Sequence, residues 1–351
     1  MIKPLTSLRF FFAFFVFLSH TGNYLKNDDG LTYLYTSFFK EGYLGVSFFF
    51  ILSGFILAYN YQNKFLENKI TKKNFYIARL ARIYPLHLLT LLLSLPLAHN
   101  LLFNANPITV VVVLLSHLTL IQSFFPMEVF YFNLNGPSWS ISNEMFFYLL
   151  FPFIVKILTG SKKYFFLLFS ITIISVSFIF FKNEFQHYVF YINPVFRVVD
   201  FLIGIVLYDV FLKIREINIT TIRWTIIEIL SLIVFATFYF NHNNVEQVFR
   251  YSSYYWLPMI FIILTFSLSK GIVSKILSCK FFVLLGEISF AFYLLHQLIF
   301  GYAKLSFGEI FIQERSIFFV FIVFLITIIL SYVAFTFFEK PINRIIRSKI
   351  K

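Results

Sequence analysis

The sequence predicts an all-α polytopic membrane protein, with about ten transmembrane helices and one extra re-entrant or interfacial segment. Hydrophobic residues make up 59% of the 351 residues and charged residues only 13%. A soluble domain of this length needs more polar surface, because its exterior faces water. Apolar runs long enough to cross a bilayer recur along the whole chain. Lysine and arginine gather in the short segments between those runs, as in membrane proteins.

Ten apolar runs are the candidate spans, and most reach the roughly 17–25 residues that a crossing helix needs. We interpret the first as an uncleaved helix and not a signal peptide, because Arg9 and His20 interrupt or border it and no small-residue cleavage site follows. No linker or repeat divides the chain, so a single integral-membrane domain, 1–351, with no appended soluble domain is expected. The spans are Leu5–Thr21, Tyr43–Tyr61, Ile83–Leu102, Trp139–Ile157, Tyr164–Phe181, Pro194–Leu212, Trp224–Phe240, Tyr254–Leu268, Phe281–Phe300 and Ile317–Phe338.

The positive charges predict an orientation. If the N-terminus is inside and the ten spans alternate, 21 of the 29 lysines and arginines fall in inner segments or at the inner end of a span, and six fall in outer segments. This bias favours cytoplasmic N- and C-termini. A full crossing by the remaining apolar stretch, Ile108–Phe125, would invert every later segment and lose most of the bias. We therefore expect that stretch to be re-entrant or interfacial on the outer side, covered by protein or lining a wet cavity.

Charge and cysteine content exclude several function classes. The net charge of +13 would suggest nucleic-acid binding in a soluble protein, but here the basic residues set orientation, so no nucleic-acid partner is expected. The single cysteine, Cys279, permits no intramolecular disulfide. No metal-ligand spacing, glycine-rich nucleotide loop or nucleophile elbow occurs, so no metal is expected.

Ionisable residues inside spans are costly and usually mark sites that face the bundle interior. Arg9 and His20 are eleven helical steps apart, which is about 20° beyond three full turns and a rise of about 16 Å. Both side chains would then lie on one stripe, Arg9 nearer the cytoplasm and His20 nearer the outer face. Arg9 would hold an anion while His20 performs proton chemistry. The alternative is that Arg9 snorkels to the inner headgroups and His20 caps the helix.

The pair Arg79 and Arg82, and the carboxylate Glu144, are further candidates for functional residues. Arg79 and Arg82 are three residues apart and share a helix face that suits phosphates, although this loop alone favours simple positive-inside anchoring. Glu144 follows an Asn-Gly-Pro break and lies about a turn and a half into a span, where an unpaired carboxylate is expensive. Its expected partner is Arg197 or a histidine.

The remaining candidates have simple structural alternatives. Arg197 and Asp200 are three residues apart and are interpreted as a structural ion pair. His296 lies near the outer end of the ninth span, where a catalytic role and a satisfied interfacial histidine are both open, and His87 is a weaker candidate. Gly54 is interpreted as a small-residue packing notch.

Six short motifs occur in one order along nearly the full chain, and together they are specific. They are Leu8-Arg9 with His20, Gly45 to Phe55, Arg79 to Pro85, Trp139-Ser140-Ile141-Ser142-Asn143-Glu144, Ile288-Ser289-Phe290 to His296, and Glu339-Lys340-Pro341. In these residues the chain resembles the membrane acyltransferase family 3, whose members O-acylate extracytoplasmic carbohydrates in bacteria. Phe10 and Gln297 depart from residues that are common in that family.

The resemblance implies an O-acyltransferase of the bacterial inner membrane, embedded among membrane lipids. The donor would be cytoplasmic acyl-CoA, in the first instance acetyl-CoA. The acceptor would be a hydroxyl of a glycan or lipid-linked sugar at the outer face, such as O-antigen or exopolysaccharide. The roles it implies are catalytic for His20, Glu144 and His296, donor-binding for Arg9, Arg79 and Arg82, and acceptor-binding for Trp139, Ser142 and Arg197.

Two other function classes fit parts of the sequence. A transporter or flippase for a glycan or anionic substrate would also place Arg9, Glu144 and Arg197 within spans, but matching broken helices in two halves are absent from the sequence pattern. A glycan polymerase would share the topology but would usually carry one large outer loop.

Overall fold

The computed structural model describes residues 2–25, 29–157, 160, 162–181 and 183–349, and those residues form helices and turns without a strand. They pack into two compact units that are interleaved along the chain. Unit 1 holds residues 1–12, 43–71 and 146–287, and unit 2 holds residues 13–42, 72–145 and 288–351. Three helices contribute residues to both units: α1 (Lys3–Ser19), α8 (Trp139–Ile157) and α16 (Lys280–Glu314).

Unit 1 is built around the close packing of two long helices. α3 (Gly45–Leu66) lies along α11 (Pro194–Ile214), with Gly54 facing Gly204 at the contact. Phe147 of α8 packs edge-on against Phe50 and stacks on Phe201, so the C-terminal part of α8 joins the same core. The unit's other helices are α9 (Lys162–Phe180), α10 (Asn183–His187), η6 (Tyr188–Ile192), α12 (Thr221–Phe240), η7 (His242–Asn244), α13 (Gln247–Arg250), η8 (Ser253–Tyr255), α14 (Trp256–Leu268) and α15 (Ile272–Leu277).

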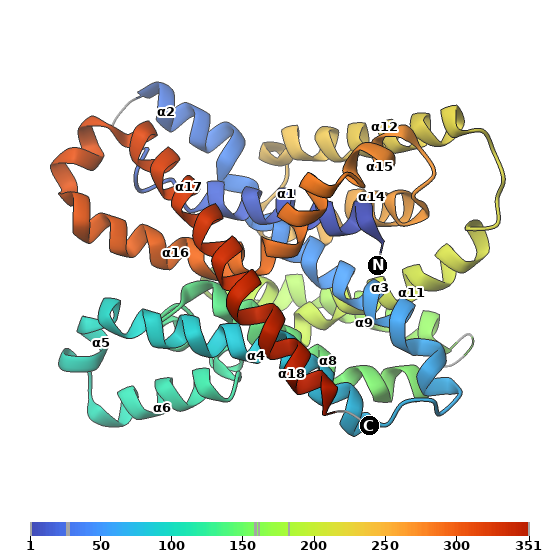
Figure 1. Cartoon of the computed structure of the whole chain (residues 1–351), viewed down its shortest axis with the longest axis horizontal. Helices are drawn as coiled ribbons and strands as arrows, with labels where there is room; N and C mark the ends of the chain where they lie inside the picture. The colour runs from blue at the N-terminus through green and yellow to red at the C-terminus, as the bar shows by residue number, and fades with distance from the viewer. Residues whose placement is uncertain (1, 26–28, 158–159, 161, 182, 350–351) are drawn as a thin grey trace. The chain divides into compact units, whose positions relative to one another are not determined.

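Unit 2 is built around α16, α4 (Lys72–Ser94) and the C-terminal helices. α16 loses helical dihedrals at Gly308 (φ 75°). α17 (Ser316–Val333) continues through the π-helical turn η9 (Ala334–Glu339) into α18 (Lys340–Ser348), which packs on α4 (Figure 1). The other elements are α2 (Asp29–Leu34), η1 (Tyr35–Phe39), η2 (Lys40–Leu44), η3 (Leu95–Leu97), α5 (His99–Asn104), α6 (Pro107–Leu118), η4 (Gln122–Phe124), α7 (Glu128–Tyr131) and η5 (Gly136–Ser138).

Helix lengths and exposed apolar surfaces are those of an integral membrane protein. Among the described residues, seven helical stretches are long and apolar enough to cross a bilayer. Only 6% of the apolar window of α9 is buried within the protein, so its exposed phenylalanines and isoleucines need lipid around them. The seven stretches are Gly30–Leu66, Lys72–Leu97, Gly136–Ile157, Lys162–Phe180, Thr221–Phe240, Lys280–Gly308 and Ser316–Ser348.

The all-helical prediction is confirmed, while the expected number of about ten crossings is not. Each predicted span overlaps a helix, but Ile83–Leu102 runs from the middle of α4 through η3 into α5. α1 has 17 residues and α14 has 13, and α11 carries several charged side chains. The stretch expected not to cross contains α6, whose 12 residues rise about 18 Å and fall short of the bilayer core. α5 and α6 run side by side (Figure 1) over a small core of Leu101, Val113 and Phe130.

Candidate functional site

His20 lies immediately beyond the end of α1. The helix ends at Ser19, and the turn that follows is closed by the hydrogen bond from the His20 amide to the Phe17 carbonyl (3.1 Å). Tyr35 fixes the same turn, because its hydroxyl donates to the Ser19 carbonyl at 3.0 Å. The expected place of His20 inside the first helix is therefore corrected to the turn that follows it. The stripe shared with Arg9, a half-buried residue of unit 1, stays a prediction.

Aromatic rings pack the end of α1 against α16. Phe17 stacks on Phe300 with ring centroids 5.1 Å apart and also contacts Phe292 at 5.6 Å. Tyr24, in the segment after His20, stacks on Phe300 at 4.8 Å. These contacts lie one turn on either side of His296 and hold it opposite His20.

The two histidines contact each other directly. His296 Nε2 lies 3.2 Å from His20 Nδ1, although the residues are 276 positions apart in sequence. His296 Nδ1 donates to the Tyr293 carbonyl at 2.6 Å, so the neutral ring has its lone pair on Nε2. His20 Nδ1 also lies 2.8 Å from the Val16 carbonyl and must carry the hydrogen there. Nε2 of His20 is then a free base, with no hydrogen bond to any described residue.

The predicted Asn-Gly-Pro break lies against the same turn of α16. Asn135 Nδ2 donates to the Leu294 carbonyl at 3.1 Å. A Cβ on Gly136 would lie 2.4 Å from Gln297 Oε1, so glycine permits the close approach. The segment that starts α8 is therefore fixed beside His296.

The first turn of α8 is completely enclosed. Ser140 Oγ lies 2.8 Å from the Tyr293 hydroxyl and donates to the Pro137 carbonyl at 2.9 Å. Ser142 donates to the Leu120 carbonyl at 2.7 Å and is 0% exposed, and Trp139 is only 4% exposed. The ring of Trp139 is enclosed by protein, and the acceptor-binding role expected for it stays a prediction. Glu144 is half-buried one turn further along α8.

The rings of His87 and His117 each donate a hydrogen bond to a backbone carbonyl. His87 Nε2 donates to the His117 carbonyl at 2.9 Å, and His117 Nε2 donates to the Phe130 carbonyl at 2.8 Å. Ser138 Oγ lies 3.4 Å from the other ring nitrogen of His117. These contacts tie α4, α6 and α7 together and give both histidines a structural role.

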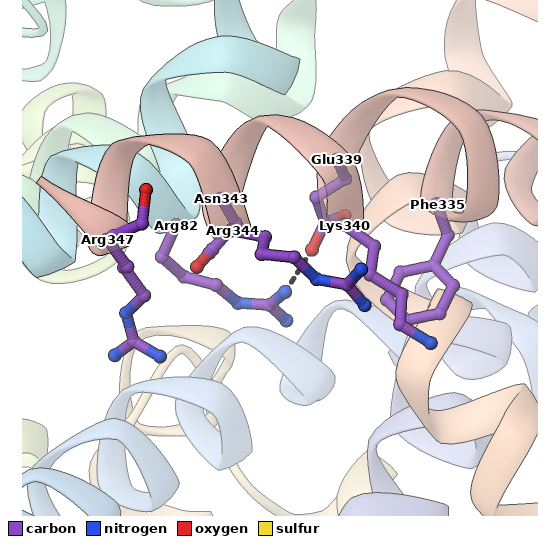
Figure 2. Close-up of a pocket in the computed structure, with 8 residues that line it drawn as sticks. Arg82, Phe335, Glu339, Lys340, Asn343, Arg344 and Arg347 are labelled. Atoms are coloured by element: carbon purple, nitrogen blue, oxygen red, sulfur yellow. Dashed lines mark hydrogen bonds and ion pairs between the residues drawn. The ribbon is translucent and has the colours of Figure 1, made fainter.

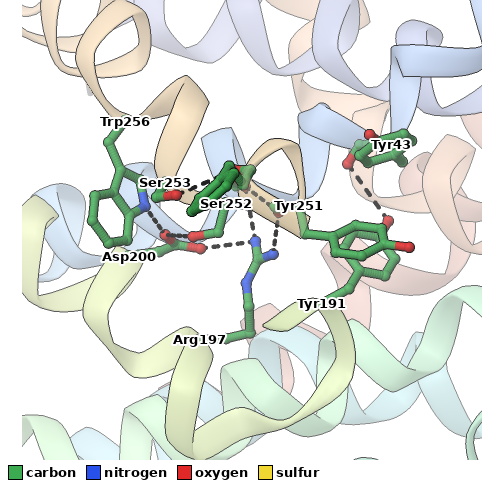
Figure 3. A network of polar contacts seen from close by, with 10 residues as sticks. Tyr43, Tyr191, Arg197, Asp200, Tyr251, Ser252, Ser253 and Trp256 are labelled. Atoms are coloured by element: carbon green, nitrogen blue, oxygen red, sulfur yellow. Dashed lines mark hydrogen bonds and ion pairs between the residues drawn. The ribbon is translucent and has the colours of Figure 1, made fainter. Parts of the chain in front are cut away.

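Arg197 forms the structural ion pair that its spacing predicts. Its guanidinium lies 2.8 Å from Asp200 and donates to the Tyr251 carbonyl at 2.6 Å and to Ser47 Oγ at 2.9 Å (Figure 3). Ser252 at 2.8 Å and the indole of Trp256 also donate to Asp200. Arg197 and Asp200 are 1% and 0% exposed, so Asp200, and not Glu144, is the carboxylate partner of Arg197.

A basic pocket lies between α4 and the C-terminal helix α18. Arg82 forms an ion pair with the buried Glu339 and lies 5.5 Å from the ring of Phe290 (Figure 2). Arg79 lies one turn earlier on α4, half-buried, with its guanidinium 5.9 Å from the ring of Phe75.

Sequence reasoning missed the C-terminal lining of this pocket, because it counted those cations only toward orientation. Lys340, Arg344 and Arg347 line it together with Arg82. Their spacing of four and then three residues puts them on one helix face, and that spacing was the available signal. No group of histidine, cysteine and carboxylate side chains able to hold a metal is found in the part of the chain that the structure describes.

The chain is similar in sequence to known acyltransferases. A family described as "Acyltransferase domain" matches residues 3–336. "Acyltransferase MdmB" of Streptomyces mycarofaciens is 36% identical over 155 residues, 43% of this chain and 38% of its own length. A "Putative O-acetyltransferase" of Staphylococcus aureus (strain COL) is 26% identical over 325 residues, 86% of this chain and 53% of its own length. The chain thus spans about half or less of these relatives. No solved structure matches.

Proposed function

Because the chain belongs to the acyltransferase domain family, we propose that it transfers an acyl group from acyl-CoA to a hydroxyl of an extracytoplasmic glycan or lipid-linked sugar. Acetyl is the first acyl group to test, in line with the O-acetyltransferase name of the staphylococcal relative. The observation that carries the proposal is the contact between His20 Nδ1 and His296 Nε2 at 3.2 Å. This contact supports a role for His20 as a base, because it favours the tautomer that has its hydrogen on Nδ1 and its lone pair on Nε2.

His20 acts as general base in the proposed reaction. Its Nε2 takes the proton of the acceptor hydroxyl while the oxygen attacks the thioester carbonyl. The tetrahedral intermediate collapses, the new ester C–O bond remains, the C–S bond breaks, and the proton passes from His20 to the departing thiolate. His296 is the positioning residue. Its Nε2 lone pair accepts from His20 Nδ1, which orients the ring and stabilises the positive charge that His20 gains.

Donor and acceptor contacts complete the proposal. Arg9, Arg79 and Arg82 are assigned to the donor, because guanidinium groups bind phosphates through paired N–H groups. Glu144 is assigned to the acceptor, because its side chain is not fully enclosed. Trp139, Ser142 and Arg197 are buried, so we propose supporting roles for them instead of acceptor contacts.

Inside-out membrane vesicles that contain the protein, supplied with acetyl-labelled CoA, test the proposal. We expect covalent label on a saccharide fraction, with a mass increase of one acetyl group, and loss of that label in the His20→Ala variant at equal expression. Wild-type vesicles that transfer no acetyl group, or that move a saccharide across the bilayer unmodified, would contradict it in favour of transport.

A further inference from the structure

The pocket beside α18 is large enough for a small-molecule ligand. It has a volume of about 530 Å³ and is lined by Arg82, Phe335, Glu339, Lys340, Asn343, Arg344, Arg347 and Ser348. Small-molecule sites are typically about 300–1,000 Å³, so a single inorganic phosphate would leave much of this space empty. Figure 2 shows Arg82 of α4 among the side chains of the C-terminal segment.

Its charge selects an anion. Four cationic side chains line the pocket against one carboxylate, Glu339, which is already paired with Arg82. Lys340, Arg344 and Arg347 are exposed to solvent, so a ligand can reach them. Three of the four cations are arginines, whose planar donor forks match phosphate oxygens.

Arg82 is held rigidly in the wall of the pocket. Glu339 is 2% exposed and engages Nη1 of Arg82, while Phe290 packs 5.5 Å from the guanidinium carbon. The other N–H groups of Arg82 make no hydrogen bond to a described residue. The ion pair therefore fixes both the arginine and the packing of α18 on α4, and it prepares the site before a ligand arrives.

The neutral lining residues indicate a nucleotide. Phe335 offers an aromatic ring, and stacking on such rings is a common way to bind a base. Asn343 offers a side-chain amide, which can pair with the donor and acceptor edge of adenine. A lipid headgroup would use the cations but has no ring to stack.

We propose that α18, together with Arg82, binds the phosphorylated adenosine end of the acyl donor. This inference rests on the proposed use of acyl-CoA. In this proposal the main phosphate contacts come from Lys340, Arg344 and Arg347 instead of the pair Arg79 and Arg82. Glu339 is then the residue that positions Arg82.

Transfer kinetics of the full chain in nanodiscs test the inference. For the double variant Arg344→Gln with Arg347→Gln, we expect the KM for acetyl-CoA to rise about tenfold or more with kcat nearly unchanged, because uniform binding energy is lost. Acetyl-pantetheine lacks the nucleotide, so its transfer should be equally slow in the variant and the wild type. Lys349→Gln removes one positive charge just beyond the end of α18, at a residue that does not line the pocket, and it should leave KM unchanged.

Each outcome has one interpretation. An unchanged KM for acetyl-CoA in the double variant overturns the inference, while wild-type transfer from acetyl-CoA still upholds the proposed function. A KM difference present in anionic phosphatidylglycerol discs and absent in phosphatidylcholine discs means that the cations bind a lipid headgroup, and also overturns it. If the double variant does not fold, the single Lys340→Gln variant and competition of wild-type transfer by adenosine 3′,5′-bisphosphate replace it. Failure of wild type to use acetyl-CoA defeats the proposed function separately.

Discussion

The chemistry proposed for His20 depends on which ring nitrogen keeps its hydrogen. Val16 and His296 both accept at Nδ1, at 2.8 Å and 3.2 Å, and this leaves Nε2 as the base. His296 can accept only because its own Nδ1 donates to Tyr293. The loss of His20 and the loss of His296 should therefore have different effects on the rate.

We expect His20→Ala to lower kcat by about 10²–10⁴-fold, the usual contribution of a general base. His296→Leu should lower kcat less, by about tenfold, with the KM values for donor and acceptor unchanged, because only the orientation of His20 is lost. His296→Gln offers an amide oxygen to His20 Nδ1 and should recover part of the rate. Initial rates measured across both substrate concentrations check this. His99→Ala, an exposed histidine on α5, is the matched control.

Equal rates for His296→Leu and wild type would show that His296 has no positioning role. Equal loss in His296→Leu and His296→Gln, both folded, would show that it has a different role from accepting a hydrogen bond.

The buried ion pair of Arg197 and Asp200 should matter for stability. Arg197→Met leaves Asp200 buried without its cation, and breaking one partner of a buried pair costs about 3–5 kcal/mol. Adding Asp200→Leu to Arg197→Met removes the unpaired charge and should restore part of the lost stability. Thermal unfolding in detergent measures both. If the double variant is no more stable than Arg197→Met alone, charge burial is not the source of the loss.

The candidate residues were largely predictable, but their partners were not. Arg197 and Asp200 share a helix turn, so spacing alone indicated their contact. His20 and His296 are 276 residues apart, and no local pattern reports that proximity. The catalytic role of Glu144 stays a prediction.

Among the helices, α3 and α11 depend on two glycines for their close approach. A Cβ on Gly54 would lie 2.0 Å from the Phe201 carbonyl oxygen, and one on Gly204 would lie 2.0 Å from the Ile51 carbonyl oxygen. Backbone atoms cannot rotate away as a side chain can. The sequence interpretation of Gly54 as a packing notch is confirmed, although Gly204 was not identified as its counterpart.

Gly54→Ala should therefore push α3 from α11 and destabilise the protein by about 1–3 kcal/mol, as overpacked cores do. The measurement is the melting temperature and the folded yield in detergent. Asn60→Ala, on an exposed position of the same helix, should change neither. A Gly54→Ala protein as stable as wild type would mean that the two helices have room to separate.

Element boundaries show where sequence reasoning ends. Apolar runs indicated a helix for every predicted span, because hydrophobicity over about 20 residues is a strong signal. The same signal cannot report that α14 has 13 helical residues or that η9 and α18 extend the last span into a basic segment. These helix boundaries depend on packing between helices. They also depend on where each cation lies along its helix, which a count of lysines and arginines does not record.

For the whole molecule, the direction of acyl transfer depends on which side of the membrane each polar segment faces. The bias of lysine and arginine predicts that residues 269–280 face the cytoplasm, on the side of the acyl-CoA pool. Cys279 lies in that segment, is exposed, and is the chain's single cysteine, so it reports the orientation without any engineering.

We expect a membrane-impermeant maleimide to label Cys279 in inside-out vesicles and to leave it unlabelled in intact cells. The thiol reacts only where the reagent can reach its thiolate. Cys279→Ser should abolish the label. Cys279→Ser combined with His99→Cys should reverse the pattern, because His99 lies at the outer end of the predicted span Ile83–Leu102. Labelling of Cys279 in intact cells would place this segment outside. The alternating spans, and with them the proposed donor side, would then be inverted.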